Sequence, residues 1–492
     1  MADLPVDTAP GSVAAGPGTP ADWRAPVPGY HGSRWPCECA GPRRQKVVGG
    51  PGLDIQPGEG LQARHRRLDD RRWPAMFVLR DEGELYLQGG SQANQRAVSY
   101  GWVERLDPVT LAPVARSPKL PSGGHNWCGA VVVHANGDLY MVNGRYAHRL
   151  DPYLEVVAER RLPADHAHNG LTILADGNIL TKDIVIRPDR QSTFTLLDPE
   201  LRIIGEFPLG FNSVGRFSCD LQPDGTSHLY VTSNAAIHRF VYADGRIARD
   251  GGWTASYALA GEDQSFAWDS TVAGGSVWFM DMGESAGLSR VLHAHPVGTN
   301  RNLKLLWLYL TLPILRRLGR NPLDRPGGGF GPPIHRAPQH VFRVSAHDAR
   351  DRDMLTPFGA PGGSVVAPPL FDQERGILVA FDLMNSRLGA WRYRGPGRLE
   401  PLWHHRFMNA NQPTLYADSG ELIVDDCKPG ERWDAVVLDI ETGSEKARVD
   451  TGCIVPTGMW YTPGFARDFY TSTAAGGIAR MAVVPIDKAG LL

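Results

Sequence analysis

From about Trp73 onward the chain repeats one pattern at intervals of about 40 to 50 residues, and this repeat limits the possible folds more than any other feature. Each unit begins with two apolar runs joined by a tight turn, such as Asn136-Gly137, Asp176-Gly177 or Asp224-Gly225. Asn-Gly and Asp-Gly turns between alternating hydrophobic residues indicate β-hairpins. A third run ends in a turn such as Leu150-Asp151-Pro152, and a fourth run follows. Four antiparallel strands at this period predict the blades of a β-propeller, an all-β fold.

The repeat predicts eight blades, with units that start near residues 73, 125, 166, 214, 264, 362, 409 and 453. Seven blades is the alternative if the first or last unit is not a full blade. The last unit holds only about three strands, so we expect the N-terminal segment to supply the missing strand and close the ring. The predicted organisation is an irregular Gly/Pro-rich arm over residues 1–72 and a β-propeller over residues 73–492. The fixed period disfavours the alternative of two β-sandwiches.

One segment, residues 283–338, interrupts the repeat and carries an apolar stretch at residues 303–315. As a helix of about 20 Å, this stretch is too short to cross a bilayer. Cations flank it, so segment 302–320 is typical of a helix embedded in a membrane surface. A helix that caps the propeller face and a helix that binds a partner are the alternatives. The expected membrane-binding residues are Leu303, Leu306, Trp307, Tyr309 and Leu310.

Composition narrows the class of protein further. The 51 Lys and Arg residues against 53 Asp and Glu give a net charge of -2, which argues against a dedicated nucleic-acid binder. The basic run of residues 64–67 is interpreted as a solvated face or linker. Six cysteines in 492 residues form no disulfide framework, and we find no secretory signal, so we expect reduced thiols in a cytoplasmic protein. Cys128 begins an apolar run and is expected to be a small buried hydrophobic residue.

Polar residues recur where the first strand of each successive unit begins, and these first strands line the axis of a propeller. Ordinary inner strands need only small and β-branched residues at such positions, so the polar set predicts a binding or catalytic site on one face. Each member taken singly is more typical of a turn or a cap. The set is His125, Asn126, Asp165, His166, His168, Asn169, Arg216, Asp220, Asp263, Asp269, Asn411 and Gln412.

Two phrases of the chain carry a family resemblance. Residues 168–183, HNGLTILADGNILTKD, and residues 216–233, RFSCDLQPDGTSHLYVTS, are similar to phrases of gluconolactonase/senescence-marker-like and strictosidine-synthase-like propellers. The resemblance implies a divalent cation, normally calcium, with Asn169 as a ligand and Asp220 as a ligand or general base. From the polar set we add Asp269 as a metal ligand, and His125, His168 and Arg216 as catalytic residues.

The predicted function is therefore metal-assisted hydrolysis of a small apolar ester or lactone by a membrane-peripheral enzyme. A hard cation held by oxygen ligands polarises an ester carbonyl and lowers the pKa of bound water. The alternative from another class is a non-catalytic propeller that serves as a binding scaffold and uses the inserted segment to dock to a membrane or partner. The sequence indicates no oligomeric state.

A second resemblance competes with the first. The C-terminal phrase of residues 436–460 resembles one in carotenoid-cleavage oxygenases, which hold iron with four axial histidines. The histidines that would correspond are His125, His168, His293 and His405, whereas Met459 stands where that phrase carries a ligand. His404 and His405 also end a fourth strand, where a solvated pair at the outer edge of a blade is expected. Quinone-dependent dehydrogenases are a third and weaker possibility, because their Gly-Lys-x-x-Trp phrase is absent from the sequence.

Overall fold

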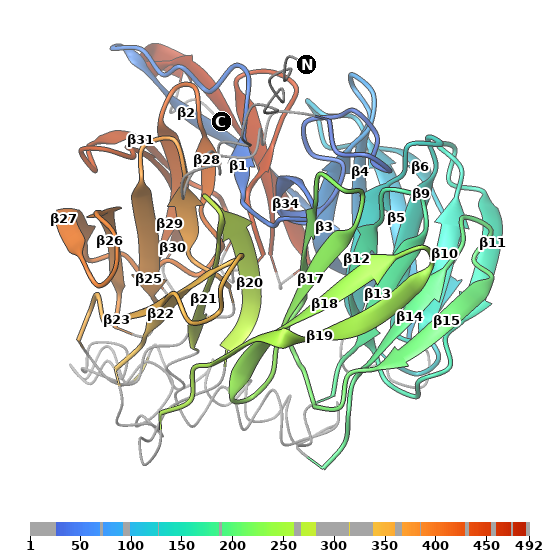
Figure 1. Ribbon diagram of the computed structural model, residues 1–492. Coiled ribbons are helices and arrows are strands. Elements are labelled where there is room, and N and C mark those ends of the chain that lie inside the picture. The colour runs from blue at the N-terminus through green and yellow to red at the C-terminus, as the bar shows by residue number, and fades with distance from the viewer. Residues whose placement is uncertain are drawn as a thin grey trace, which may run out of the picture.

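The computed structural model shows a ring of eight β-sheets around one axis, an eight-bladed β-propeller (Figure 1). The predicted fold class and the preferred blade number are confirmed. The structure describes residues 26–68, 72–91, 99–125, 127–185, 189–259, 267–281, 314, 338–359, 367–383, 385–428, 432–453, 459–473 and 476–488.

Each blade holds four strands that run antiparallel from the axis outward, and we number the blades along the chain. Blades 1 to 3 are β3 (Arg72–Leu79), β4 (Leu85–Ser91), β5 (Tyr100–Leu106) and β6 (Pro113–Arg116); β8 (Cys128–Val133), β9 (Leu139–Asn143), β10 (Tyr146–Leu150) and β11 (Val156–Arg161); and β12 (His168–Ile173), β13 (Ile179–Asp183), β14 (Thr193–Leu197) and β15 (Ile203–Pro208). Blades 4 to 6 are β16 (Ser218–Leu221), β17 (Ser227–Thr232), β18 (Ala236–Ala243) and β19 (Arg246–Ser256); β20 (Ala267–Ala273), β21 (Ser276–Asp281), β22 (Val341–Ser345) and β23 (Arg352–Leu355); and β24 (Leu370–Asp372), β25 (Ile377–Asp382), β26 (Arg387–Tyr393) and β27 (Leu399–His405). Blade 7 is β28 (Thr414–Tyr416), β29 (Glu421–Lys428), β30 (Arg432–Asp439) and β31 (Glu445–Asp450), and blade 8 is β32 (Thr462–Pro463), β33 (Asp468–Thr473), β34 (Gly477–Pro485) and β2 (Glu59–Arg67).

Two short strands add to these blades: β7 (Leu120–Pro121) pairs with β5, and β1 (Val47–Val48) pairs with β28. The elements η1 (Glu38–Ala40) and η4 (Ile486–Lys488) are short 3-10 helices.

The turns that marked the repeat in the sequence connect the first and second strands of their blades. At Asp176-Gly177 the aspartate Oδ1 accepts a hydrogen bond from Asn178 N at 3.0 Å, and Gly177 has a φ of 85°. A short polar side chain that bonds to the backbone two residues later, followed by a residue in the left-handed region, favours this tight turn. The same pairing at Asn136 and Asp224 explains why the sequence shows the hairpins so clearly.

The ring closes with a strand from each end of the chain. Strand β2 pairs antiparallel with β34 along its whole length, from Glu59 opposite Pro485 to Arg67 opposite Gly477. The expectation that the N-terminal segment supplies the missing strand is confirmed. The basic run of residues 64–67 lies in this strand, so residues 59–67 are regular structure within the segment predicted to be irregular.

Within the rest of the N-terminal arm, residues 35–48 lie inside the ring, and residues 49–58 lead outward to β2, the outermost strand of blade 8 (Figure 1). Residues of the arm bond to the inner part of every blade, and most of these bonds use backbone groups. In blade order they are Leu79 N to Trp35 O, Val133 N to Pro36 O, Ile173 N to Tyr30 Oη, Cys219 N to Pro42 O, Val272 N to Arg43 O, Lys46 Nζ to Pro368 O, Leu415 N to Lys46 O, and Arg34 Nη1 to Gly464 O.

The arm and the inserted segment connect to opposite faces of the ring. The arm lies at the turns between first and second strands, where Tyr30 pairs with His134 and Ala135 N bonds to Gly29 O; we call this the arm face. Strand β21 ends at Asp281 and β22 begins at Val341, with Met280 opposite Val341, at the other end of the blade. We call that end the insertion face; the inner strands β8, β12, β16 and β20 begin there.

The predicted apolar helix is not supported by the structure. Within residues 283–338 only Ile314 and Pro338 belong to the described part, so Leu303, Leu306, Trp307, Tyr309 and Leu310 lie outside it. The helices whose bounds lie in the described ranges are the two 3-10 helices, and Ile314 alone is a described residue in helical conformation within the inserted segment. In those ranges no helix has the length and apolar character needed to span a membrane.

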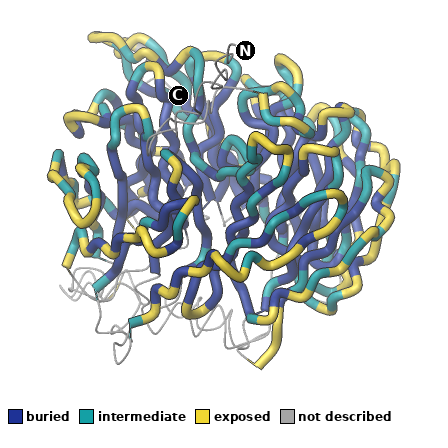
Figure 2. The backbone as a smooth tube through the Cα atoms, viewed as in Figure 1, coloured by how far each residue is buried: buried dark blue, intermediate teal, exposed yellow. Residues whose placement is uncertain are grey.

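Burial follows the order of strands within each blade. First and second strands such as β8, β9, β12 and β13 are buried throughout, whereas the outermost strand β15 alternates between intermediate and exposed residues (Figure 2). The core therefore lies between neighbouring blades. Side chains on the axis must find partners within it, because water is excluded from most of the inner strands.

Candidate functional site

A buried cluster of four charged side chains from the arm and from blades 4 and 5 lies on the axis. Arg44 of the arm bonds to Glu38, and its Nη2 lies 2.7 Å from Asp269 Oδ2. Arg216 Nε lies 2.9 Å from Glu38 Oε2, and Arg216 N donates to Asp269 Oδ1 at 2.6 Å. We call Glu38, Arg44, Arg216 and Asp269 the axial ion cluster. Two cations and two carboxylates balance, which permits their burial.

The arm reaches this position through an unusual backbone. Cys39, Ala40, Arg44 and Lys46 all have φ between 59° and 68°, a region that non-glycine residues adopt rarely. Such residues persist where the surroundings over-determine the conformation. Here the determinants are the axial ion cluster and Lys46, whose fully buried Nζ donates to the carbonyls of Pro368 and Pro369. Burial lowers the pKa of Lys46 to about 8.

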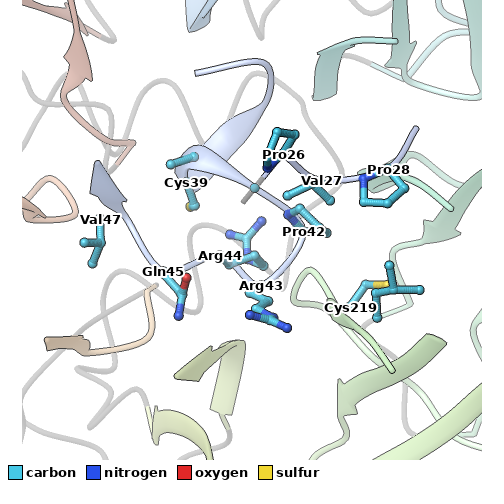
Figure 3. Close-up of a pocket in the computed structure, with 13 residues that line it drawn as sticks. Pro26, Val27, Pro28, Cys39, Pro42, Arg43, Arg44, Gln45, Val47 and Cys219 are labelled. Atoms are coloured by element: carbon cyan, nitrogen blue, oxygen red, sulfur yellow. The ribbon is translucent and has the colours of Figure 1, made fainter. Parts of the chain in front are cut away.

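A small pocket of about 170 Å³ opens beside the arm and is lined mainly by it. Figure 3 shows Arg43 and Arg44 in the middle of the arm loop, with Cys219 of β16 beside them. Arg43 Nε lies 2.5 Å from Asp220 Oδ1, so the cation of the arm neutralises this carboxylate. The pocket wall is therefore made of groups that already have partners within the chain.

The three predicted metal ligands do not share a point in space at which they could hold one ion. Asn169 Oδ1 accepts from Trp127 Nε1 at 3.1 Å, and Asn169 Nδ2 donates to Val214 O at 3.2 Å. Asp220 pairs with Arg43, and both oxygens of Asp269 take N–H groups from arginines. Among the described residues no three His, Cys, Asp or Glu side chains lie close enough to bind a metal ion. These residues do not fit a calcium ion, and calcium and iron stay predictions from sequence.

Outside the axial ion cluster, titratable side chains at the insertion face reach solvent. His166 Nδ1 lies 3.0 Å from Asp183 Oδ2, and the histidine side chain is 32% exposed whereas that of the aspartate is 2% exposed. Asp183 Oδ1 also accepts from Thr193 N at 2.6 Å. A buried carboxylate that fixes one nitrogen of a partly exposed imidazole leaves the other nitrogen able to exchange protons.

The charge of Asp183 is maintained by its neighbours. Burial acts to raise the pKa of Asp183, but hydrogen bonds from His166 and Thr193 and the nearby Lys182 ammonium outweigh burial and hold this pKa below its ordinary value. Lys182 is itself fully buried, and burial lowers its pKa to about 8. The sequence analysis missed Asp183 and Lys182, although both end the phrase of residues 168–183 on which the resemblance rested.

A second histidine lies on the same face. His125 Nε2 is 3.4 Å from Asp165 Oδ1, and Arg145 bonds to the same carboxylate. The hydrogen bond from His125 and the charge of Arg145 lower the pKa of Asp165. Because Asp165 precedes His166 in the chain, the two His–Asp pairs are neighbours between blades 2 and 3.

Three tryptophans lie at or just before the first strands of blades 1, 2 and 8. Trp73 and Trp127 have ring centroids 5.8 Å apart, and both are partly exposed. Trp460 is buried beneath the Arg216 guanidinium, at 5.8 Å from its ring centroid. Indole surfaces beside acid–base groups suit a substrate with an apolar body and one polar reacting bond.

The structure separates the other predicted residues. His168 is fully buried, which lowers its pKa to about 3, and its Nδ1 lies 3.5 Å from Thr181 Oγ1. Asn411 and Gln412 are buried before β28, where Asn411 donates to Thr471 and Gln412 lies near Cys39. Asn126, Asp263 and His293 lie outside the described residues.

Two further predictions concern residues away from the axis. His405 belongs to the outermost strand of blade 6, so it cannot share an axial iron site with His125 and His168; the expected outer-edge position is confirmed. All six cysteines are free and buried, and burial raises the pKa of the Cys128 thiol, as expected for an inert hydrophobic residue.

Comparison with known proteins supports the fold. No family model and no curated relative matches the sequence. Among solved structures, a quinohemoprotein alcohol dehydrogenase from Comamonas testosteroni is similar at 10% identity and a TM-score of 0.53, over 91% of this chain and 81% of that one. A 6-phosphogluconolactonase described as putative, from Bacteroides uniformis, is similar at 13% identity and a TM-score of 0.42, over 75% and 96% of the two chains. At these identities the similarity concerns the propeller fold alone.

Proposed function

We propose that the protein is a hydrolase that acts on a small, largely apolar ester or lactone at the insertion face, with His166 as general base. The observation that carries this proposal is the His166–Asp183 pair, in which a buried carboxylate orients an exposed imidazole. The pair brackets the phrase of residues 168–183 that resembles lactonase propellers. The partly exposed Trp73 and Trp127 supply apolar surface for the substrate.

The chemistry follows from the orientation of the imidazole. With Nδ1–H donating to Asp183, Nε2 takes a proton from water as the water oxygen attacks the ester carbonyl. The bond from the carbonyl carbon to the leaving oxygen then breaks, and the proton on Nε2 passes to that oxygen. The products are an acid and an alcohol, or one hydroxy acid from a lactone. No step in this scheme passes through a metal, because the predicted ligands do not converge.

The test compares the wild type with His166→Gln in the hydrolysis of a panel of aryl esters, aliphatic lactones and aromatic lactones. We expect kcat/KM to fall by about 10²- to 10⁴-fold, the usual contribution of a general base. His404→Gln, on outermost strand β27, is the matched control and should retain the wild-type rate. Equal rates in His166→Gln and the wild type would remove His166 from the mechanism. If the wild type hydrolyses no member of the panel, the hydrolase proposal fails.

A scaffold without catalysis is the second candidate, and the filled axis supports it. The charges of the axial ion cluster are paired with one another, so they are not available to bind a substrate. The arm also bonds to all eight blades. The two candidates separate on the hydrolysis panel. For the hydrolase and for the scaffold alike, we propose that segment 302–320 contacts a membrane surface. We also propose that the protein is cytoplasmic. Both proposals are independent of whether the protein is an enzyme.

A further inference from the structure

Lys182 is the fully buried cation nearest in sequence to the proposed catalytic pair, and the mechanism above does not use it. Its Nζ donates to Asp183 O at 2.9 Å and to Ser213 O at 3.0 Å. The first bond holds the end of β13, and the second reaches the segment that enters blade 4. One ammonium therefore ties the strand end that carries Asp183 to the neighbouring blade.

The blade 4 segment is held firmly at this point. Ser213 O also accepts from Ser192 Oγ at 3.1 Å and from Val185 N at 3.1 Å. Asn169 Nδ2 donates to the next carbonyl, that of Val214. Because other groups also bind Ser213 O, the segment does not need a lysine for hydrogen bonding alone. What Lys182 adds is a positive charge in a fully buried position.

Burying an ammonium group is unfavourable unless nearby carboxylates neutralise its charge. Burial lowers the pKa of Lys182 to about 8, while the charges of Asp183 and Asp269 act in the opposite direction. The Lys182 charge in turn helps to keep Asp183 ionised. The lysine and the aspartate thus support each other's charged forms.

We propose that Lys182 is a positioning residue for His166: it fixes the Asp183 end of β13 and places a positive charge beside the His166–Asp183 pair, which favours the neutral imidazole that a general base needs. This inference rests on the proposed function for its kinetic consequence only. The titratable and charged groups that surround His166 are Asp183 on β13, His168 on β12, Asp165 beside it in the chain, and Arg145 and His125 on Asp165.

The experiment measures the reactivity of the His166 imidazole directly and needs no substrate. Diethyl pyrocarbonate acylates neutral imidazole, and mass spectrometry of the His166 peptide gives its rate between pH 5.5 and 8. In Lys182→Met we expect the half-maximal rate to move to higher pH by about half a unit, because loss of a nearby positive charge favours the protonated imidazole. The rate on the acidic side should therefore fall by about threefold.

Two further variants separate charge from structure. Lys182→Gln can still donate to Ser213 O but lacks the charge, so it should shift the profile as Lys182→Met does. Ser192→Ala removes a neutral hydrogen bond to the same carbonyl, together with the bond that the Ser192 hydroxyl accepts from Ser213 N, and should leave the profile at its wild-type position. A Lys182→Gln profile that superimposes on the wild type overturns the inference, as does an equal shift in Ser192→Ala.

The kinetic readout distinguishes failure of this inference from failure of the proposed function. If His166→Gln abolishes hydrolysis but Lys182→Gln keeps the wild-type pH–rate profile, the hydrolase stands and the role of Lys182 is wrong. If His166→Gln retains activity while Lys182→Gln still shifts acylation of His166, the electrostatic link stands and the proposed function fails.

Discussion

The axial ion cluster and the His166–Asp183 pair both lie near the starts of inner strands, but their charged groups have different surroundings. In the axial ion cluster, Arg44 and Glu38 of the arm satisfy Asp269 and Arg216 inside the ring, away from water. At the insertion face, His166 and Asp183 satisfy each other and leave the imidazole in contact with solvent. Polar residues near a propeller axis are therefore neutralised where the arm reaches them and remain available for chemistry where it does not.

The arm explains this difference. The arm bonds to every blade, so its own groups occupy this part of the axis. It buries Trp35, Cys39 and Leu53 almost completely, and each buried apolar side chain contributes roughly 1.5 to 3 kcal/mol. A sum of that size makes the arm a permanent part of the ring and not a lid.

The largest effect is expected where the axial ion cluster loses a cation. Arg44→Met removes one of the two cations that Glu38 and Asp269 share, and breaking a buried pair in this way destabilises a fold by about 3 to 5 kcal/mol. The midpoint of urea unfolding should fall accordingly. Arg43→Met, whose pair with Asp220 is partly exposed, is the matched control and should cost about 1 kcal/mol or less. Equal midpoints for the two variants would show that the buried cluster contributes no more to stability than the partly exposed pair.

Acid should destabilise the ring through histidines that are buried in their neutral form. Burial lowers the pKa of His148 to about 4 and that of His168 to about 3, whereas an unfolded histidine titrates near 6.5. Below pH 6.5 the unfolded chain binds protons that the folded chain excludes, so stability falls as pH drops toward 4. Each histidine contributes a slope of at most about 1.4 kcal/mol per pH unit.

Urea unfolding at pH 7, 6 and 5 measures this slope, and His148→Gln should flatten it. His404→Gln, on an outer strand, should not alter the slope. A slope unchanged in His148→Gln would mean that its burial does not govern the acid response.

A smaller effect is expected at the tryptophans of the insertion face. Trp127→Phe removes the hydrogen bond to Asn169 Oδ1 and leaves an apolar ring beside Trp73. We expect a loss of stability of about 1 kcal/mol and a KM for apolar esters that rises several-fold with little change in kcat. Trp391→Phe, in blade 6, controls for a tryptophan lost elsewhere. A fall in kcat with unchanged KM would contradict a substrate-binding role.

The smallest effect on the fold is expected for the inserted segment. Deletion of residues 300–335 should leave thermal unfolding nearly unchanged, because β21 and β22 pair without them. The same deletion should shift the protein from the pellet to the supernatant of an anionic liposome sedimentation assay. Replacing Arg316 and Arg317 by Gln separates the charge from the apolar stretch. A deletion that collapses the fold would contradict the membrane prediction.

The sequence predicted the ring because its signals are local. Turns such as Asp176-Gly177 depend on a side chain and a φ within a few residues, and they recur in each blade with the same spacing. The same locality revealed that the last unit lacked a strand. The number of blades and the shared closing blade could therefore be predicted before any contact between distant segments was known.

The site was predicted only in part, because alignment on turns places a residue at the start of a strand but does not say what it meets there. His125 and Arg216 occupy equivalent positions, yet one lies at the insertion face on Asp165 and the other bonds to the arm. His166 and Asp183 are 17 positions apart and meet because β12 and β13 form a hairpin, with His168 opposite Asp183. The burial of Lys182 could not be predicted from the sequence, because a single lysine at the end of a strand is typically exposed to solvent.

The repeat in the sequence by itself determined a propeller closed by both ends of the chain and favoured eight blades over seven, since strand pairing and turn geometry depend on residues close together in the sequence. Only the tertiary structure decided which axial charges are neutralised, because the partners of Asp220, Asp269 and Arg216 lie in an arm more than 170 residues away. A segment rich in glycine and proline has no periodicity of its own. Its conformation is set by the inner strands that surround it, and its burial follows from their closure into a ring.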